Sequence, residues 1–133
     1  MKTFELKIIT PDGMMYDAEA ESILVRTTLG DVTILPSHAD YLALIEYGHV
    51  KIKSDGKERF AAATNGFLSV SGGKVRVVAT TFEFADEIDK DRAERAKREA
   101  EERRDRAKSD AELRVAEMKL KRALLRLDVS NRM

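Results

Sequence analysis

The sequence predicts an α+β protein in which an N-terminal antiparallel β-sandwich or flattened barrel is followed by a C-terminal antiparallel α-helical hairpin. Up to about Ala85, short β-branched runs are separated by glycine turns, which is typical of an all-β segment. Beyond Ala85 the chain is a block of Ala, Glu, Lys and Arg, which favours helix. A Ser-x-x-Glu capping box at residues 109–112 divides that block in two. We therefore expect a β-sandwich domain over residues 1–85 and a helical hairpin over residues 86–133.

The first part contains about eight short segments that are apolar or that alternate between apolar and polar residues. The predicted strands are residues 4–8, 23–28, 32–35, 42–45, 49–53, 60–63, 67–70 and 75–80. Turn signals separate them, including Asp55-Gly56, Asn65-Gly66 and Gly72-Gly73. Strands at a spacing of about ten residues are typical of a sandwich or flattened barrel that is built mostly from antiparallel hairpins.

The second part is predicted to be two helices that pack through small residues. Alanines recur at three- and four-residue steps in the first helix, at Ala93, Ala96, Ala100 and Ala107. In the capping box, the Ser109 hydroxyl is expected to bind the Glu112 amide, and the Glu112 carboxylate the Ser109 amide. The apolar stripe of the second helix, expected to face the alanines, is Leu113, Ala116, Leu120, Ala123, Leu124 and Leu127. Such a seam buries little area, so the hairpin should be only weakly stable by itself.

Composition excludes several classes of function. The 133 residues include 24 basic and 24 acidic side chains, so the zero net charge indicates neither nucleic acid nor an anionic membrane surface as partner. No cysteine is present, which excludes disulfides and thiolate metal sites. No segment approaches the roughly 20 apolar residues that cross a bilayer, so direct membrane insertion is not expected. Residues 1–5 alternate and are predicted to enter the first strand rather than to form a signal peptide.

The sequence indicates no independent catalyst. His38 lies in a predicted loop and His49 in a predicted strand, without clustered carboxylates at ligand spacing, so no metal site is expected. There is no Walker-type phosphate loop, no nucleophile elbow and no recognisable pair of catalytic acids. We expect no catalytic residue, no required cofactor and a non-enzymatic role.

Three arginines point to a polyphosphate site. Arg122 and Arg126 are four residues apart on one helix face, and Arg92 lies near the start of the preceding helix, so an antiparallel hairpin brings them to the same end. Guanidinium groups offer planar bidentate donors to phosphate. Asp89 could accept from an exocyclic amine, and Ala93 leaves space for a flat ring. The alternative is a solvated helix face with exposed ion pairs.

Several short motifs follow one another along the chain in the order and spacing of a known family. They are Thr10-Pro11-Asp12-Gly13, Gly30-Asp31-Val32-Thr33-Ile34-Leu35-Pro36-Ser37-His38, the Asn65-Gly66-Phe67 turn and the Ile88-Asp89-x-x-Arg92-Ala93 junction. Together with a terminal helical hairpin they resemble the epsilon subunit of bacterial F-type ATP synthase, over essentially the whole chain. That family usually has glycine at the positions of Thr33 and Ser37.

The resemblance implies a non-catalytic rotor subunit of the central stalk. The β-sandwich of that family binds the gamma subunit and rests on the c ring, with the loop around Asp31 as the contact. The hairpin permits turnover when folded on the sandwich, and blocks ATP hydrolysis when it extends into the alpha/beta catalytic head. The protein would be peripheral to the bacterial cell membrane, on its cytoplasmic side.

The resemblance also assigns residues to two ligands. In the extended state, cationic positions lie near an acidic segment of the beta subunits, and these positions are Arg103, Arg104, Arg106, Arg122 and Arg126. Members that bind ATP as a regulatory ligand use positions that map to Glu83, Ile88, Asp89, Arg92, Ala93, Arg122 and Arg126. A further family arginine aligns with Glu99, which reverses the charge beside a triphosphate.

Two other classes of function stay open at this point. One is a free-standing adaptor or holdase that presents the charged hairpin to client proteins without a gamma partner or a nucleotide. The other is a sugar hydrolase, which requires two carboxylates that face one groove, with Glu19, Glu21 and Asp31 as candidates.

Overall fold

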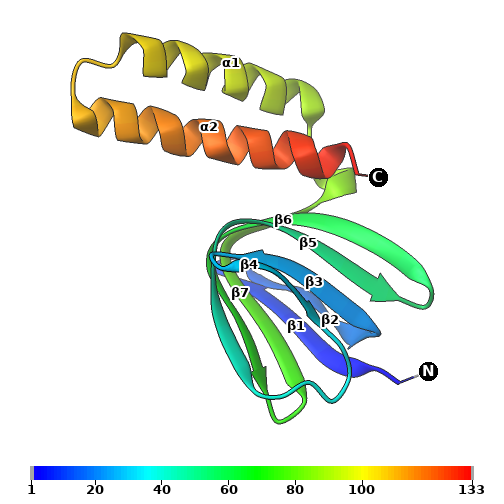
Figure 1. Ribbon diagram of the computed structural model, residues 1–133. Helices are drawn as coiled ribbons and strands as arrows, with labels where there is room; N and C mark the ends of the chain where they lie inside the picture. The colour runs from blue at the N-terminus through cyan, green and yellow to red at the C-terminus, as the bar shows by residue number, and fades with distance from the viewer. Residues whose placement is uncertain (1, 133) are drawn as a thin grey trace.

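The computed structural model describes residues 2–132 and consists of a curved β-sheet with two helices stacked on one side of it (Figure 1). The strands are β1 (Phe4–Thr10), β2 (Gly13–Ala20), β3 (Ser22–Thr27), β4 (Gly30–Ile34), β5 (Tyr41–Ser54), β6 (Lys57–Ser71) and β7 (Lys74–Phe84). A 3-10 turn, η1 (Ala85–Glu87), leads to α1 (Lys90–Arg106) and α2 (Asp110–Ser130). The predicted class, a β-sandwich followed by a helical hairpin, is therefore confirmed.

The strands form one sheet with the order β2-β1-β7-β6-β5-β3-β4, which folds over on itself as a flattened sandwich (Figure 1). Every pair is antiparallel except β1 and β7, which run parallel. This parallel pair joins the first and the last strand of the chain. The prediction of a sandwich built mostly from antiparallel hairpins agrees with this pairing.

Two predicted strand breaks are absent. The segments at 42–45 and 49–53 belong to one strand, β5, and those at 60–63 and 67–70 belong to β6. Asn65-Gly66 is not a turn but a kink inside β6, where Asn65 has φ 48° and the Thr80 hydroxyl donates to the Asn65 carbonyl at 2.9 Å. An Asn-Gly pair supplies positive φ equally well to a kink and to a turn, so the residues alone do not decide between them.

The kink runs across three neighbouring strands. In β5 the side chains that face the core change from Ala43 and Ile45 to Val50 and Ile52, which have the opposite parity. In β6 the corresponding change separates Ala61 and Ala63 from Leu68 and Val70, and in β7 it separates Val75, Val77 and Ala79 from Phe82 and Phe84. The strands therefore present one set of side chains inward at one end and the alternate set at the other, which lets the sheet wrap around its own core.

The core of the sandwich is complete within the strands. Its buried cluster runs from Phe4 to Phe84 and includes Leu6, Ile8, Ile23, Ile52 and Leu68, each with almost no exposed surface. A second, smaller cluster lies on the outer face and joins α2 to the sheet. The sheet thus has its own hydrophobic core, and the helices cover only part of its outside.

One strand was missed by the sequence prediction, and one predicted strand begins earlier than expected. Most side chains of β2 are exposed, because this is an edge strand, and such a strand lacks the alternation that identifies buried strands. The strand predicted at 32–35 is β4, which begins at Gly30, so Asp31, which was expected in a loop, lies on a strand. Ser37, at a position where the resembling family usually has glycine, has φ 66°, which is a left-handed conformation.

The helical hairpin differs from its predicted details in two places. The Ser109 hydroxyl accepts from the Glu112 amide as expected, at 3.1 Å, but the Glu112 carboxylate accepts from the Lys108 amide at 2.9 Å rather than from Ser109. Ala93, Ala100, Ala116 and Ala123 are buried in the seam, whereas Leu124 is 45% exposed. Among the described residues, no helix is both long and apolar enough to cross a membrane.

Gly66→Ala should destabilise the fold strongly, because a Cβ at this position would overlap the carbonyl oxygen of Val78 on the neighbouring strand. We expect a loss of about 2 kcal/mol or more in the free energy of unfolding, measured by urea denaturation. Ser69→Ala, on the same strand, is the control and should change that free energy by less than about 0.5 kcal/mol. A Gly66→Ala variant as stable as the control would contradict the close approach of β6 and β7.

Candidate functional site between the sheet and the helical hairpin

The interface between α2 and the sheet is small and apolar. Leu125 and Val129 of α2 are buried against Ala62 of β6 and Ala85 of η1. Tyr47, Phe60 and Ile88 surround this cluster and are partly buried. The Lys121 ammonium lies 5.8 Å from the centre of the Tyr47 ring, which adds a weak cation–π contact. In Figure 1, α2 lies between the sheet and α1, so α2 provides the contact.

The sequence prediction missed Leu125 and Val129 as docking residues. α2 has two apolar stripes that are adjacent around the helix. The predicted stripe was the one expected to face the alanines of α1, and the stripe that faces the sheet was not predicted. Leu125 and Val129 are four residues apart, as the helical repeat requires for a second apolar face. A hairpin that packs on a third layer needs two such faces on its inner helix, and this signal could have identified them.

One ion pair spans the interface. Both Nε and Nη2 of Arg126 lie 2.7 Å from Oε1 of Glu83, so the guanidinium edge donates two bonds to one carboxylate oxygen. Glu83 is the last residue but one of β7. Its side chain is 30% exposed, and that of Arg126 is 36% exposed. The partial burial strengthens the pair relative to an exposed one, because water competes less for both groups.

Two cavities of about 190 Å³ each lie beside this ion pair, and Arg122 and Arg126 line both. The first is between α2 and the sheet, where Thr64, Thr81 and Glu83 also contribute. The second is between the helices and is lined by Ala96, Glu99, Ala100, Arg103, Lys119, Arg122, Ala123 and Arg126. Four cationic side chains against one carboxylate make the second cavity suited to an anion such as a phosphate chain.

The junction residues have clear structural roles. Asp89 is the N-cap of α1, and its carboxylate accepts from the Arg92 amide at 3.1 Å. Ala93 is buried at the start of the helix seam, and Ile88 contacts the docking cluster of α2. The Glu87 carboxylate accepts from the Phe84 amide at 3.1 Å, which fixes the 3-10 turn between strand and helix.

A second charged contact holds the same junction from the sheet side. The Arg59 guanidinium lies 3.6 Å from the centre of the Phe84 ring, a cation–π arrangement, and 3.9 Å from the Asp86 carboxylate. Phe84 in turn packs edge-on against Phe82 at 5.2 Å. Residues 84–87 therefore leave the sheet in a defined direction.

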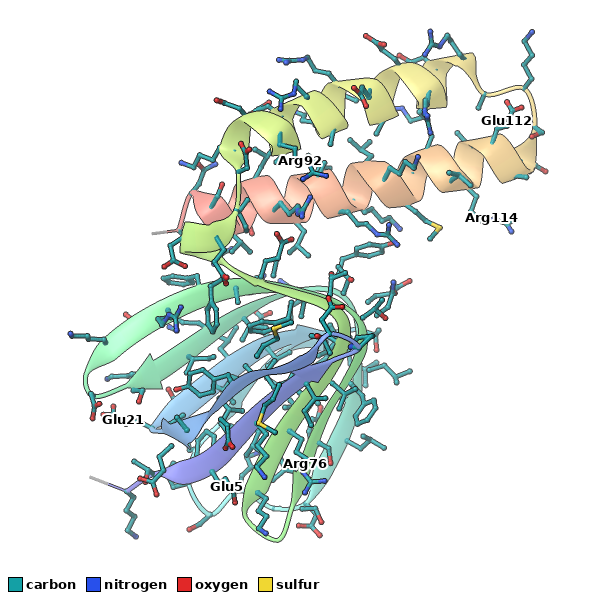
Figure 2. The ribbon with its side chains drawn as sticks, turned by 180° about the vertical axis from the view of Figure 1, so that it is seen from behind. Glu5, Glu21, Arg76, Arg92, Glu112 and Arg114 are labelled. Atoms are coloured by element: carbon teal, nitrogen blue, oxygen red, sulfur yellow. The ribbon has the colours of Figure 1, made fainter. Side chains whose placement is uncertain are left out.

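The structure brings together part of the predicted polyphosphate site. Arg122 and Arg126 line the same cavities, and Glu83 contacts Arg126, but Arg92 lines neither cavity. Figure 2 shows Arg92 on the first turns of α1, near the connection to the sheet. Arg103 and Lys119 line the inter-helix cavity, although Arg103 was predicted only for the beta subunit and Lys119 was not predicted at all. Side chains from two helices meet only after packing, so spacing within one helix could not reveal this set.

The other cationic positions are distributed toward the hairpin tip. Arg103 and Arg106 line a larger cavity of about 470 Å³ with Val115 and Ala116 at that end. Arg104 lies 3.5 Å from its neighbour Asp105. Of the five arginines predicted to contact the beta subunits, Arg122 and Arg126 thus face the sheet and the helix seam, whereas Arg103, Arg104 and Arg106 are near the tip.

Asp31 is held on the β3–β4 hairpin by two basic side chains. Its Oδ1 lies 2.7 Å from Nε of Arg26, the residue directly opposite on β3, and 3.3 Å from Nε2 of His49 on β5. The adjacent turn places Leu29 at the tip with 90% of its surface exposed. This end of the sandwich combines an oriented carboxylate with an exposed apolar side chain.

Two of the carboxylates considered for a sugar hydrolase, Glu21 and Asp31, lie near opposite ends of β3. Glu21 precedes β3 and accepts from the Gly56 amide at 3.2 Å, while Asp31 pairs with Arg26 near the other end of β3. Glu21 and Arg26 are five residue steps apart along the strand, which is about 16 Å. Glycoside hydrolysis requires carboxyl groups about 5–9.5 Å apart, so Glu21 and Asp31 do not form such a pair.

The outer face of β5 and β6 away from the helices is apolar and exposed. Leu42 and Leu44 are 69% and 62% exposed, and Phe67, directly opposite Leu44 on β6, is 37% exposed. We call Leu42, Leu44 and Phe67 the apolar face. Neighbouring exposed apolar side chains on one sheet surface are typical of a protein–protein interface.

The role of Asp89 as the N-cap of α1 can be tested by its effect on the stability of the hairpin. Asp89→Ala should lower the stability of the helical hairpin by about 1 kcal/mol, since the Arg92 amide loses its acceptor. Asp89→Asn keeps an acceptor in the same place and should be nearly neutral. Thermal unfolding followed by circular dichroism of the helices measures both variants, and an equal loss in the two would contradict the capping role.

Comparison with known proteins agrees with this architecture. Residues 3–85 match the family model described as ATP synthase, Delta/Epsilon chain, beta-sandwich domain, and residues 86–131 match the model described as ATP synthase, Delta/Epsilon chain, long alpha-helix domain. An ATP synthase epsilon chain of Bacillus velezensis is 44% identical over 130 residues, which cover 98% of both chains. That of Bacillus subtilis is 42% identical over 132 residues, covering 99% of this chain and all of the relative.

Solved structures show the same fold at low sequence identity. A chain of the Euglena gracilis mitochondrial ATP synthase superposes with a TM-score of 0.85 at 20% identity, over 97% of this chain and 81% of that one. A chain from the central stalk and c-ring of the Tetrahymena thermophila mitochondrial ATP synthase gives 0.63 at 14% identity, over 97% of each. Because the two family models together span nearly all of the sequence, and close relatives match end to end, this chain belongs to the ATP synthase delta/epsilon family.

Proposed function

We propose that this protein is a non-catalytic subunit of the central stalk of a bacterial F-type ATP synthase, which connects the gamma subunit to the c ring and inhibits ATP hydrolysis through its helical hairpin. The observation that carries this proposal is the separation of two hydrophobic clusters. The sandwich buries its core within residues 4–84, and the hairpin docks on it through a small outer cluster. Release of α2 therefore leaves the core of the sandwich intact.

The proposed partners fit separate surfaces. The apolar face on β5 and β6 is the proposed contact with gamma, because its leucines are exposed on a rigid sheet. Asp31, oriented by Arg26 and His49, is the proposed contact with the polar loops of the c ring. These surfaces lie outside the interface between α2 and the sheet, so both partners can stay bound while the hairpin moves. The protein would then be peripheral to the cell membrane, on its cytoplasmic side.

The extended hairpin would present its arginines to the alpha/beta catalytic head. Arg103, Arg104, Arg106, Arg122 and Arg126 would face an acidic segment of the beta subunits by charge attraction. In the docked state Arg122 and Arg126 are turned toward the sheet and the helix seam. A free-standing adaptor is not favoured, because both family models match and the relatives are named as ATP synthase epsilon chains.

ATP is the proposed regulatory ligand of the docked state. The cationic cavity between the helices would receive phosphate groups, and Asp89 and Ala93 lie at the start of α1 where a base could bind. A ligand held by both helices stabilises the closed hairpin only to the extent that it binds that state better than the open one. Glu99 in this cavity opposes the binding of a polyanion.

Two variants test the central proposal together. Leu44→Glu places a charge in the apolar face and should weaken binding to purified gamma by at least about tenfold. A chain truncated after Asp86, which retains the sandwich core, should bind gamma normally but no longer inhibit ATP hydrolysis by the reconstituted catalytic complex. Leu124→Glu, an exposed leucine on α2, is the matched control for the first variant and should leave binding to gamma unchanged. Retained inhibition after truncation would refute the role of the hairpin.

Nucleotide binding is tested separately by calorimetric titration with ATP. Arg122→Ala removes a guanidinium from both cavities and should weaken binding by about tenfold or more, whereas Glu99→Gln should strengthen it. Arg114→Ala is the control, because Figure 2 shows Arg114 near the tip of α2, away from Arg92. Equal affinities for all of these chains would exclude a nucleotide site in this cavity.

A further inference from the structure

The Glu83–Arg126 pair is the only ion pair that joins the helices to the strands among the described residues. The other charged pairs lie within the sheet, lie within the helical hairpin, or reach no further than η1. In contrast, Glu83 and Arg126 are 43 positions apart in sequence and meet only when α2 is docked on the sheet. Their contact therefore reports directly on the docked state of the hairpin.

The ion pair fixes the orientation of the Arg126 guanidinium group relative to β7. Nε and Nη2 of Arg126 both point to Oε1 of Glu83 at 2.7 Å, so the guanidinium engages the strand through one edge. Arg126 also lines the cavity between the helices, which contains Arg103, Lys119 and Arg122. Glu83 thus supplies a negative charge beside a group of cations that would otherwise repel one another.

The apolar part of the same interface is small. Leu125 and Val129 are the buried α2 side chains in the docking cluster, and they meet two buried alanines, with Tyr47, Phe60 and Ile88 only partly buried at the margin. Alanine offers little area to bury, so the apolar contact by itself holds the hairpin weakly. An ion pair of this geometry is then a large fraction of what keeps α2 on the sheet.

We propose that Glu83 and Arg126 form an electrostatic latch that sets how often the hairpin is docked before any nucleotide binds. Arg126 cannot pair with Glu83 and bind an acidic partner at the same time, because both interactions use the same guanidinium group. An acidic surface on the catalytic head therefore competes with Glu83 for the same side chain. The proposal rests on the proposed function in one respect, namely that the hairpin undocks.

The test measures docking in the full chain without nucleotide or partner subunits. The sequence has no cysteine, so Lys53→Cys on β5 and Lys108→Cys at the hairpin tip provide two unique positions for spin labels. Pulsed electron paramagnetic resonance then gives the distribution of distances between sheet and tip. In the doubly labelled chain with Glu83 and Arg126 unaltered, we expect mainly one narrow population of distances, which corresponds to the docked hairpin.

Charge reversal separates the latch from other effects of substitution. Glu83→Lys and Arg126→Glu should each lower the ratio of docked to undocked molecules by at least about fivefold, because each leaves like charges facing one another. The double variant restores opposite charges and should recover most of the docked population. Glu58→Lys, which breaks the Lys51–Glu58 pair within the sheet, is the control and should change nothing.

Each outcome decides the proposal. It is overturned if either single variant is as docked as the parent, if the parent itself is mostly undocked, or if the double variant is as open as the single ones. Circular dichroism of every variant verifies that the strands and helices are formed. Inhibition of ATP hydrolysis is measured separately in the reconstituted complex, so a failure of the proposed function would appear there even when the latch behaves as expected.

Discussion

The closure of the sheet around its own core is the constraint on which the rest of the structure depends. Coordinated kinks in β5, β6 and β7 change the parity of the side chains that face inward, so the strands enclose a complete hydrophobic core of their own. On the outside, beneath the helices and separate from the apolar face, is a shallow apolar area around Ala62, where α2 buries Leu125 and Val129. A stable body with a weakly attached arm is the direct result of this division of apolar surface.

The weak attachment gives charged residues unusual influence. In a large interface one ion pair changes little, but here the Glu83–Arg126 pair acts beside a small contact, in which α2 buries one leucine and one valine against two alanines and three partly buried side chains. The same arginine lines a cationic cavity between the helices. Docking of α2, anion binding and any acidic partner surface are therefore coupled, because all three draw on a small set of guanidinium groups.

The sequence predicted the class of fold well because its signals were local. The Asp55-Gly56 and Gly72-Gly73 turns, the Ser109 cap and the alanine seam all involve neighbours within a few residues. The prediction failed where a local signal had two structural outcomes. Asn65-Gly66 formed a kink instead of a turn, and β2 lacked alternation because it is an exposed edge strand. The candidate site was half predicted: Arg122, Arg126 and Glu83 come together, whereas Arg92 does not line the cavity and Lys119 does.

The amino-acid sequence by itself determined two unlike parts, their order, the strand and helix periodicity and the cap that divides the hairpin, since each depends on short-range backbone preferences and on hydrophobic repeat. Only the tertiary structure decided which face of α2 meets the sheet and which arginine meets Glu83. Those contacts join residues more than 40 positions apart, as in the 43 positions between Glu83 and Arg126. No local preference encodes them, because they form only when two independently patterned surfaces are brought into contact by the turn at residues 85–89.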